Sequence, residues 1–217
     1  MFLDLFFPNR CLECSLIIEN EKLICDFCLN KINFTHWQWN EENPLKTKMQ
    51  LLMPVEKAFA LFHFEREGLS RKIIHQLKYR KQEKIGIILA NWVAERLHFN
   101  EDKPDVLVPV PLHHKKLKER GYNQLHLFTE TLSQLYEIPF NHDLLKRNSY
   151  NKAQAKQNKH QRLETQYDFG VTKTIENQHL LLIDDVLTTG NTLSTMAWEI
   201  LKSGNNRISI LVMAVDG

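Results

Sequence analysis

The sequence predicts an α/β domain, built on a parallel sheet with helices on both faces, preceded by a small module that carries cysteines. Two units predict the sheet, because apolar runs at residues 106–110 and 180–183 are each followed by a loop and then by a segment of helical periodicity. All four cysteines lie within the first 28 residues, which predicts the module. We therefore divide the chain into a module with its linker, residues 1–50, and an α/β domain, residues 51–217.

The bulk composition fits one α/β domain with a small appendage. Of the 217 residues, 43% are hydrophobic, which is enough for a core and excludes a disordered or fibrous chain. The 28 basic and 26 acidic residues leave a net charge of only +2, so charge alone does not predict nucleic-acid or membrane binding. Asp4 and Pro8 interrupt the apolar start, and no run approaches the ~18 apolar residues of a membrane span. We expect a cytoplasmic protein without membrane insertion.

The cysteines form two C-x2-C pairs, Cys11 with Cys14 and Cys25 with Cys28, separated by ten residues. Each pair places two thiolates in one tight turn, and two pairs supply the tetrahedral sulfur set that Zn²⁺ prefers. A segment of about 40 residues buries too little apolar surface to fold alone, so the metal would supply its folding free energy. Four sulfur ligands leave no open position, which predicts a structural zinc site. Disulfides, inert thiols, an iron–sulfur cluster and a redox dithiol remain alternatives.

The segment 36–54 is predicted to be a linker or docking arm, with Trp37 and Trp39 as candidate anchors. Residues 1–50 contain five basic and seven acidic side chains. Because zinc ribbons that bind DNA are usually basic, this balance favours a structural role for the module, or a role as a hood over the domain.

Apolar patterns predict the remaining elements of the domain. Strands are expected at 58–64 and 207–215, and helices near 69–79 and 84–98. A further helix is expected at 122–136, where four apolar residues share one face: Leu125, Phe128, Leu132 and Leu135.

The segment 180–204 combines a strand, a polar loop and a helix. Asp184 and Asp185 end the apolar strand, where carboxylates are costly unless they have a partner or a function. The loop that follows offers hydroxyls, backbone N–H groups and a helix N-terminus, which together favour an anion: Thr188, Thr189, Gly190, Asn191 and Thr192. Acids beside an anion cradle suggest a ribose 5-phosphate site. The alternative is an ordinary turn capped by Asp and Thr.

This segment resembles the motif with which type I phosphoribosyltransferases bind 5-phosphoribosyl-1-pyrophosphate (PRPP). The resemblance implies that Asp184 and Asp185 bind the ribose hydroxyls and that residues 188–192 hold the 5′-phosphate. It also implies Mg²⁺ as the companion of PRPP. No residue stands out as a general base, so the catalytic residues stay unassigned.

A cationic segment follows the predicted strand 106–110. It contains His113, His114, Lys115, Lys116, Lys118 and Arg120. In the enzymes that the chain resembles, the loop at this place contacts pyrophosphate, and cations suit such a ligand. The resemblance thus implies pyrophosphate contacts for Arg120 and Gly121, the latter through its backbone. The alternative is a solvated helical face.

The segment 144–163 contains six Lys or Arg residues and no Asp or Glu, with little apolar periodicity. It is predicted to be a mobile loop or a hairpin tip. In type I phosphoribosyltransferases a flexible loop here closes over PRPP, which implies that Lys146, Arg147 and Arg162 neutralise the leaving pyrophosphate. A basic loop that grips a nucleic-acid backbone is the competing interpretation.

The whole chain resembles the ComF family through CLEC with CDFC, QLKY around Lys78, VPVPLHHKKLKERGYNQ and LLIDDVLTTGNTL. Gln154 and Arg162 agree with the family's loop, whereas Thr165 stands where an asparagine is expected. The resemblance implies a zinc-finger-like module on a type I phosphoribosyltransferase fold, with a role in natural transformation. Single-stranded DNA and a competence helicase-type protein would be partners. Two functions follow: phosphoribosyl transfer from PRPP to an unknown acceptor, or a non-catalytic PRPP-sensing module that binds single-stranded DNA.

Overall fold

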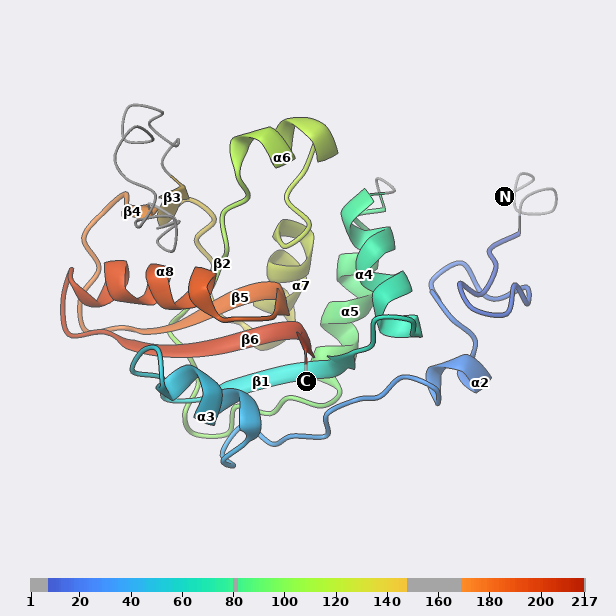
Figure 1. The fold of residues 1–217 in the computed structure, drawn as a ribbon, viewed down its shortest axis with the longest axis horizontal. Coiled ribbons are helices and arrows are strands. Elements are labelled where there is room, and N and C mark those ends of the chain that lie inside the picture. The colour runs from blue at the N-terminus through green and yellow to red at the C-terminus, as the bar shows by residue number, and fades with distance from the viewer. Residues whose placement is uncertain (1–7, 80–81, 148–168, 217) are drawn as a thin grey trace, which may run out of the picture.

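The computed structural model describes residues 8–79, 82–147 and 169–216 (Figure 1). Its centre is a four-stranded sheet in the order β1, β6, β5, β2, and every neighbouring pair is parallel. The strands span Ala58–Phe64 (β1), Arg207–Asp216 (β6), His179–Leu187 (β5) and Val106–Pro109 (β2). The predicted parallel sheet is confirmed.

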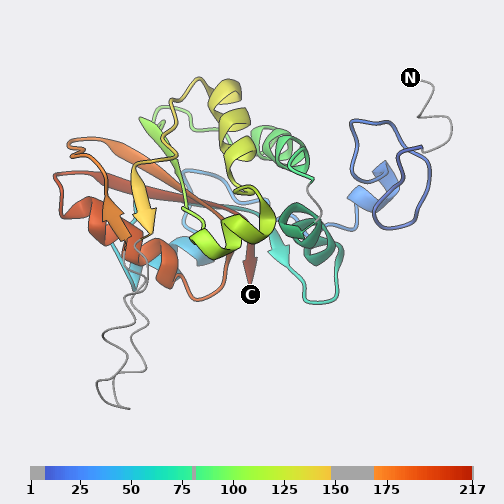
Figure 2. The ribbon, with the colours of Figure 1, turned by 90° about the horizontal axis from the view of Figure 1, so that it is seen from above.

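Helices cover both faces of this sheet (Figures 1 and 2). On one face lie α3 (Pro44–Gln50) and α8 (Asn191–Leu201), and on the other lie α5 (Ile85–Ala94) and α7 (His126–Tyr136). The cover explains the continuous apolar runs of the central strands, since a strand buried on both faces has no polar side. Residues 180–183 of β5 and 210–214 of β6 all have 0% exposure.

Two predicted helices are shorter than expected. Helix α4 (Leu69–Tyr79) fits its prediction, but α5 ends at Ala94 instead of continuing to residue 98. The predicted helix 122–136 begins only at His126. Asn123 explains that late start, because its side chain accepts from Leu125 N and donates to the Val110 carbonyl, and so holds a turn before the helix.

The cationic segment after β2 is itself a helix, α6 (His114–Arg120), where only a loop was expected. The His113 ring caps it by accepting from Lys115 N through Nδ1 at 3.2 Å. Gly121 ends it with a φ of 84°, a left-handed conformation that glycine adopts without strain. Residues 114–119 are exposed on this helix, as the interpretation as a solvated helical face predicts, and the pyrophosphate contacts stay a prediction.

Strand β5 does not end at the two acids. It continues through Asp184 and Asp185 to Leu187, paired with β6 as far as Val215. Because the ten-residue β6 supplies backbone partners along this whole length, the ladder persists past a change in side-chain polarity.

A two-stranded antiparallel ribbon of β3 (Leu145–Arg147) and β4 (Phe169–Val171) stands beside the main sheet. Residues 145–147 of the segment 144–163 thus form a strand, and the part of it expected to be a mobile loop or a hairpin tip lies outside the described residues. Residues 148–168, which include Gln154 and Arg162, lie outside the described residues.

The arm between the cysteines and β1 packs on the sheet domain. Thr35 N donates to the Leu61 carbonyl, and His63 N to the Asn33 carbonyl, so the arm adds a short bridge along β1. Trp39 is 2% exposed, lies edge-on to Phe99 at 5.0 Å, and donates from Nε1 to the Asp102 carbonyl. Its role as an anchor is confirmed.

The cysteine-containing segment, with the short helix α2 (Asp26–Leu29), forms one end of the molecule, away from the sheet (Figures 1 and 2). An ion pair of 2.8 Å joins its Glu13 to Lys72 of α4. Within the described residues, none of the helices combines the length and the apolar character needed to cross a bilayer.

Candidate functional site

The predicted ribose-phosphate residues gather where β5 leads into α8. Parallel α/β sheets bind ligands beyond the carboxyl ends of their strands, and this is such an end. Asp184 and Asp185 lie in β5, residues 188–190 form the loop, and Asn191 opens α8. The carboxylates and the hydroxyls are therefore supplied by one continuous strand, loop and helix.

Asp185 is buried but has charged and polar partners. The Lys78 ammonium lies 2.8 Å from its Oδ1, and the Gln124 side-chain amide donates to its Oδ2. Lys78 comes from the last turn of α4, and Gln124 from the turn before α7. A buried carboxylate with both oxygens bound is held in one orientation.

The network continues from Gln124 to Arg120. Arg120 donates from Nη1 to Gln124 Oε1 at 2.7 Å, and its guanidinium lies 5.0 Å from the centre of the Tyr79 ring. Arg120 is 7% exposed, so it is packed between α4 and α7 and is not displayed on a loop. Sequence analysis assigned no site role to Gln124, because nothing in its sequence neighbourhood predicts a contact with Asp185.

Asp184 is half-buried, and its Oδ1 accepts from Asp185 N at 2.8 Å. Burial and the adjacent Asp185 charge raise the pKa of Asp184 to about 7, although Lys78 and Arg147 act to lower it. Near neutral pH this carboxyl is thus close to its midpoint. A bound cation, or donors from a sugar, would favour its ionised form.

The loop after β5 keeps its hydroxyls accessible. Thr188 and Thr189 are exposed, and Thr189 Oγ1 accepts a long hydrogen bond of 3.5 Å from Asn191 N. Gly190 has a φ of 83° and precedes the first turn of α8. Thr192 is half-buried in that turn. Hydroxyls beside the first turn of an eleven-residue helix suit an anion.

Glycine is required at position 190 for a second reason. A Cβ atom there would lie 2.6 Å from Met49 Sδ and 2.9 Å from Leu52 Cδ1. The arm is also tied to α8, because Trp198 Nε1 donates to the Leu52 carbonyl at 2.9 Å. Met49 and Leu52 of the arm therefore pack against the loop at Gly190, a contact that the sequence did not predict.

Arg147 has an electrostatic effect on this site. Its guanidinium lies over the Phe169 ring at 5.5 Å, and its charge acts on both Asp184 and His113. Burial first, and then the nearby charges of His114 and Arg147, lower the pKa of His113. Gly121 is exposed at the end of α6, and the fourth predicted pyrophosphate contact, Arg162, lies outside the described residues.

A cavity of about 400 Å³ includes one predicted pyrophosphate contact, Gly121, and is lined by Glu83, Leu117, Gly121, Tyr122, Asn123, His126, Leu127 and Glu130. Its lining includes neither acid of the candidate site. Because Gln124 is directed towards Asp185 while His126 and Glu130 line the cavity, the cavity and the acids contact different sides of this chain segment.

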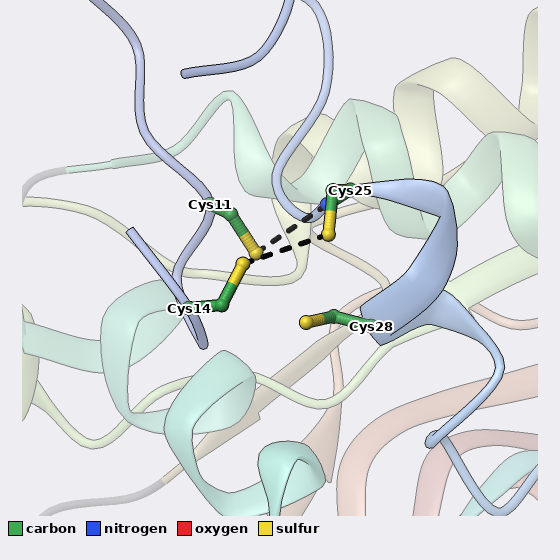
Figure 3. Close-up of side chains that lie close together, drawn as sticks. All are labelled: Cys11, Cys14, Cys25 and Cys28. Carbon is green, nitrogen blue, oxygen red and sulfur yellow. Dashed lines mark hydrogen bonds between the residues drawn. The ribbon is translucent and has the colours of Figure 1, made fainter. Parts of the chain in front are cut away.

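The four cysteines form the second site (Figure 3). Their sulfur atoms all lie within 4.8 Å of one another, and Cys14 Sγ and Cys25 Sγ are 3.7 Å apart. Tetrahedral ligands with Zn–S bonds of about 2.3 Å would stand roughly 3.8 Å apart, so the spacing fits such a metal. All four are free thiols, which argues against the disulfide alternative. The residues fit a structural metal site.

Backbone donors distinguish the thiols of this cluster. Burial opposes ionisation of Cys11, but hydrogen bonds from Cys14 and Cys25 outweigh it and lower the pKa to about 6. Burial and the other three cysteines raise the pKa of Cys28 to about 12. Four such thiols can ionise together only when a cation neutralises them.

Comparison with known families defines the class of protein. A family model described as a phosphoribosyl transferase domain matches residues 75–217. The match includes both acids, the phosphate-type loop and α6. The chain belongs to the phosphoribosyltransferase domain family, and its sheet with helices on both faces has the type I phosphoribosyltransferase fold.

Individual relatives assign the chain to a narrower family within this class. It is 39% identical to the competence protein ComFC of Bacillus subtilis over 104 residues, 48% of this chain and 41% of that protein. It is 30% identical to competence protein F of Haemophilus influenzae, over 65% of this chain and 66% of that one. The DNA utilization protein YhgH of Escherichia coli is 24% identical and covers 92% of this chain, with 87% of its own length matched. The chain is a member of the ComF family.

Solved structures give weaker likenesses. Purine phosphoribosyltransferase from Pyrococcus horikoshii has 18% identity and a TM-score of 0.38, over 73% of this chain and 78% of that one. Adenine phosphoribosyltransferase from Leishmania tarentolae has 12% identity and a TM-score of 0.40, over 73% and 91%. At these scores the overlap is too partial to support an inference, so the fold assignment rests on the family model and the sheet.

Proposed function

We propose that this protein binds PRPP with Mg²⁺ at the end of β5. The observation that carries the proposal is the continuous run of two acids, a left-handed glycine and a helix N-terminus within a phosphoribosyltransferase domain. Asp184 and Asp185 would bind the ribose hydroxyls, while Thr188, Thr189, Gly190, Asn191 and Thr192 would hold the 5′-phosphate. Mg²⁺ would offset the charge of the pyrophosphate.

Cations around the site would receive the pyrophosphate. We propose this role for Arg120, Gly121, Arg147 and Arg162, with Arg147 supported by its effect on the pKa of Asp184. Lys78 supports the same assignment, because its ammonium already faces the ribose acids. Electrostatic stabilisation of a leaving group by such charges lowers a barrier without a general base.

The reaction proposed is phosphoribosyl transfer: an amine or base attacks ribose C1 and the C1–pyrophosphate bond breaks. The acceptor is unassigned. The second candidate is a non-catalytic PRPP sensor, favoured by the engagement of Arg120 with Gln124 and Tyr79, which turns one expected pyrophosphate ligand inwards.

The names of the relatives suggest the setting. ComFC and competence protein F are named for competence, and YhgH for DNA utilization. We propose a cytoplasmic role in DNA uptake, with single-stranded DNA and a competence helicase-type protein as partners.

We further propose that the metal in the cysteine module is zinc with a structural role. Four sulfur donors near tetrahedral spacing support zinc over hard cations. The division into residues 1–50 and 51–217 is proposed with it. Arm residues 33–50 pack on the sheet and would stay with the domain if the cysteines were removed.

Calorimetric titration of the metal-loaded full chain with PRPP and Mg²⁺ tests the proposal. The wild type should bind, and the Asp184→Asn/Asp185→Asn variant should lose most of that affinity. A Glu101→Gln/Asp143→Asn variant, which removes two exposed charges elsewhere, is the matched control and should bind normally. Absence of binding by the wild type would refute the proposal. Pyrophosphate release on addition of amines or bases would then separate transfer from sensing.

A further inference from the structure

One face of α4 displays aromatic and basic side chains at helical spacing. Arg71, His75 and Tyr79 follow one another at four-residue steps and are all exposed, Tyr79 by 54%. Side chains at this spacing lie one above the other on a helix. The rings of His75 and Tyr79 accordingly lie 5.0 Å apart. We call these three residues the α4 stripe.

The α4 stripe continues onto α6, which lies next to α4 (Figure 2). The link is Arg120, whose guanidinium lies over the Tyr79 ring at 5.0 Å. Helix α6 carries three exposed lysines and one exposed glutamate: Lys115, Lys116, Lys118 and Glu119. Because Arg120 is only 7% exposed, the stripe and the exposed side of α6 are joined through a buried cation, and the two rings lie between Arg71 and the α6 lysines.

The rest of the fold leaves much of this surface in solvent. Within the residues that the structure describes, Arg71 makes no ion pair, whereas its neighbour Lys72 is paired with Glu13. Tyr79 contacts Arg120 and His75 and leaves more than half of its surface in solvent. An exposed ring flanked by cations has the composition of surfaces that bind a ligand carrying both flat rings and negative charge.

The chemistry of the surface selects its ligand. Exposed rings stack on unpaired bases, and interleaved cations follow a phosphate backbone. A duplex hides the faces of its bases, so the rings favour a single strand. The Tyr79 ring packs on Arg120, which donates to Gln124, and Gln124 in turn donates to Asp185, so a strand on this surface would lie near the two acids.

We propose that the α4 stripe and α6 bind single-stranded DNA, with bases stacked on Tyr79 and His75 and phosphates held by Arg71 and the α6 lysines. This deepens the DNA-uptake part of the proposed function by naming the surface. It does not depend on PRPP binding.

Fluorescence anisotropy of a labelled oligothymidylate, titrated with the metal-loaded full chain, tests the proposal. Tyr79→Ala should weaken binding by roughly 5- to 100-fold, the range of one lost base stack. Tyr79→Phe keeps the ring and should bind within about twofold of the wild type. Arg71→Gln should reduce the slope of log affinity against log salt by about 0.7, the value for one phosphate of a single strand.

Phe140→Ala is the matched control, because this ring is 42% exposed but lies outside the surface, and its affinity should be unchanged. No binding by the wild type, equal binding by Tyr79→Ala, or a loss in Tyr79→Phe as large as in Tyr79→Ala would each overturn the proposal. Arg71→Gln should bind PRPP and Mg²⁺ as the wild type does, because Arg71 lies outside the network of the two acids, so failure of the PRPP site and failure of the DNA surface are distinguishable.

Discussion

The cysteine module and the sheet domain are stabilised by different interactions. In the module, large apolar side chains remain exposed, with Ile17 at 59% and Phe27 at 73%, while the four cysteines converge. In the domain, residues 180–183 and 210–214 have no exposed surface at all. Apolar burial therefore stabilises the domain, whereas the module depends on ligands for a metal.

The functional side chains of the two regions therefore affect stability in opposite directions. The cysteines that would bind the metal also hold their module together. Asp184 and Asp185 instead bring two negative charges to a partly buried place, and the raised pKa of Asp184 measures that cost. Removal of the cysteines should thus unfold the module, whereas neutralising Asp184 should stabilise the domain.

The largest expected effect is the loss of the module when its metal site is broken. Cys28→Ser removes a fully buried ligand, and metal binding in zinc-finger peptides contributes on the order of 10 kcal/mol. We expect loss of bound zinc and rapid proteolysis near residues 8–32, with an unchanged denaturant midpoint for the sheet domain. Zinc analysis, limited proteolysis and circular dichroism measure these three quantities.

Asn20→Ser, at an exposed position of the same module, is the control and should keep its zinc. A cooperative loss of the whole sheet signal in Cys28→Ser would contradict the contrast between the two regions. Chelation of the wild type should reproduce the effect of the substitution.

A smaller effect of opposite sign is expected at Asp184. Its pKa rises from 3.8 to about 7 on folding, so between these values the folded state binds more protons than the unfolded state. The free energy of unfolding should therefore fall as pH rises from about 4 to 7. At pH 8 the Asp184→Asn variant should have a higher melting temperature than the wild type, by about 2–4 °C for each kcal/mol of stability gained. Near pH 4 the two melting temperatures should be the same.

Thermal melts across this pH range measure the difference, with the exposed Asp143→Asn as the control variant. A lower melting temperature for Asp184→Asn at pH 8 would mean that the ionised carboxylate stabilises the fold. That result would contradict the conclusion that the ionised form of Asp184 destabilises the sheet domain.

The smallest effect is expected where the two regions meet. The ion pair of Lys72 and Glu13 has side chains that are 51% and 29% exposed, and such pairs contribute about 0–1 kcal/mol. Lys72→Gln should change the rate of zinc release to a chelator by less than about fivefold. A larger change would show that the domain holds the module together, and a double-mutant cycle with Glu13→Gln would assign the effect to the pair.

Much of this protein's structure could be predicted from its sequence, because it depends on the chemistry of neighbouring residues. The two C-x2-C pairs predicted the metal cluster, because residues three apart share a turn. The two acids of β5 and the loop and helix that follow it were predicted together, since they are consecutive in the chain. Continuous apolar runs predicted the buried strands. Trp39 was one of two tryptophans predicted to anchor the arm, and the structure confirms that role. All these features depend on neighbours within a few residues.

Tertiary structure alone decided the rest. Lys78, Arg120, Gln124 and Asp185 come from separate elements and meet only because the sheet order places α4 and α7 beside the end of β5. The support of Gly190 by Met49 and Leu52 likewise joins distant segments. Periodicity and spacing report the faces and turns of single elements. The partner that covers each face is chosen by packing across the whole domain, which no local pattern encodes.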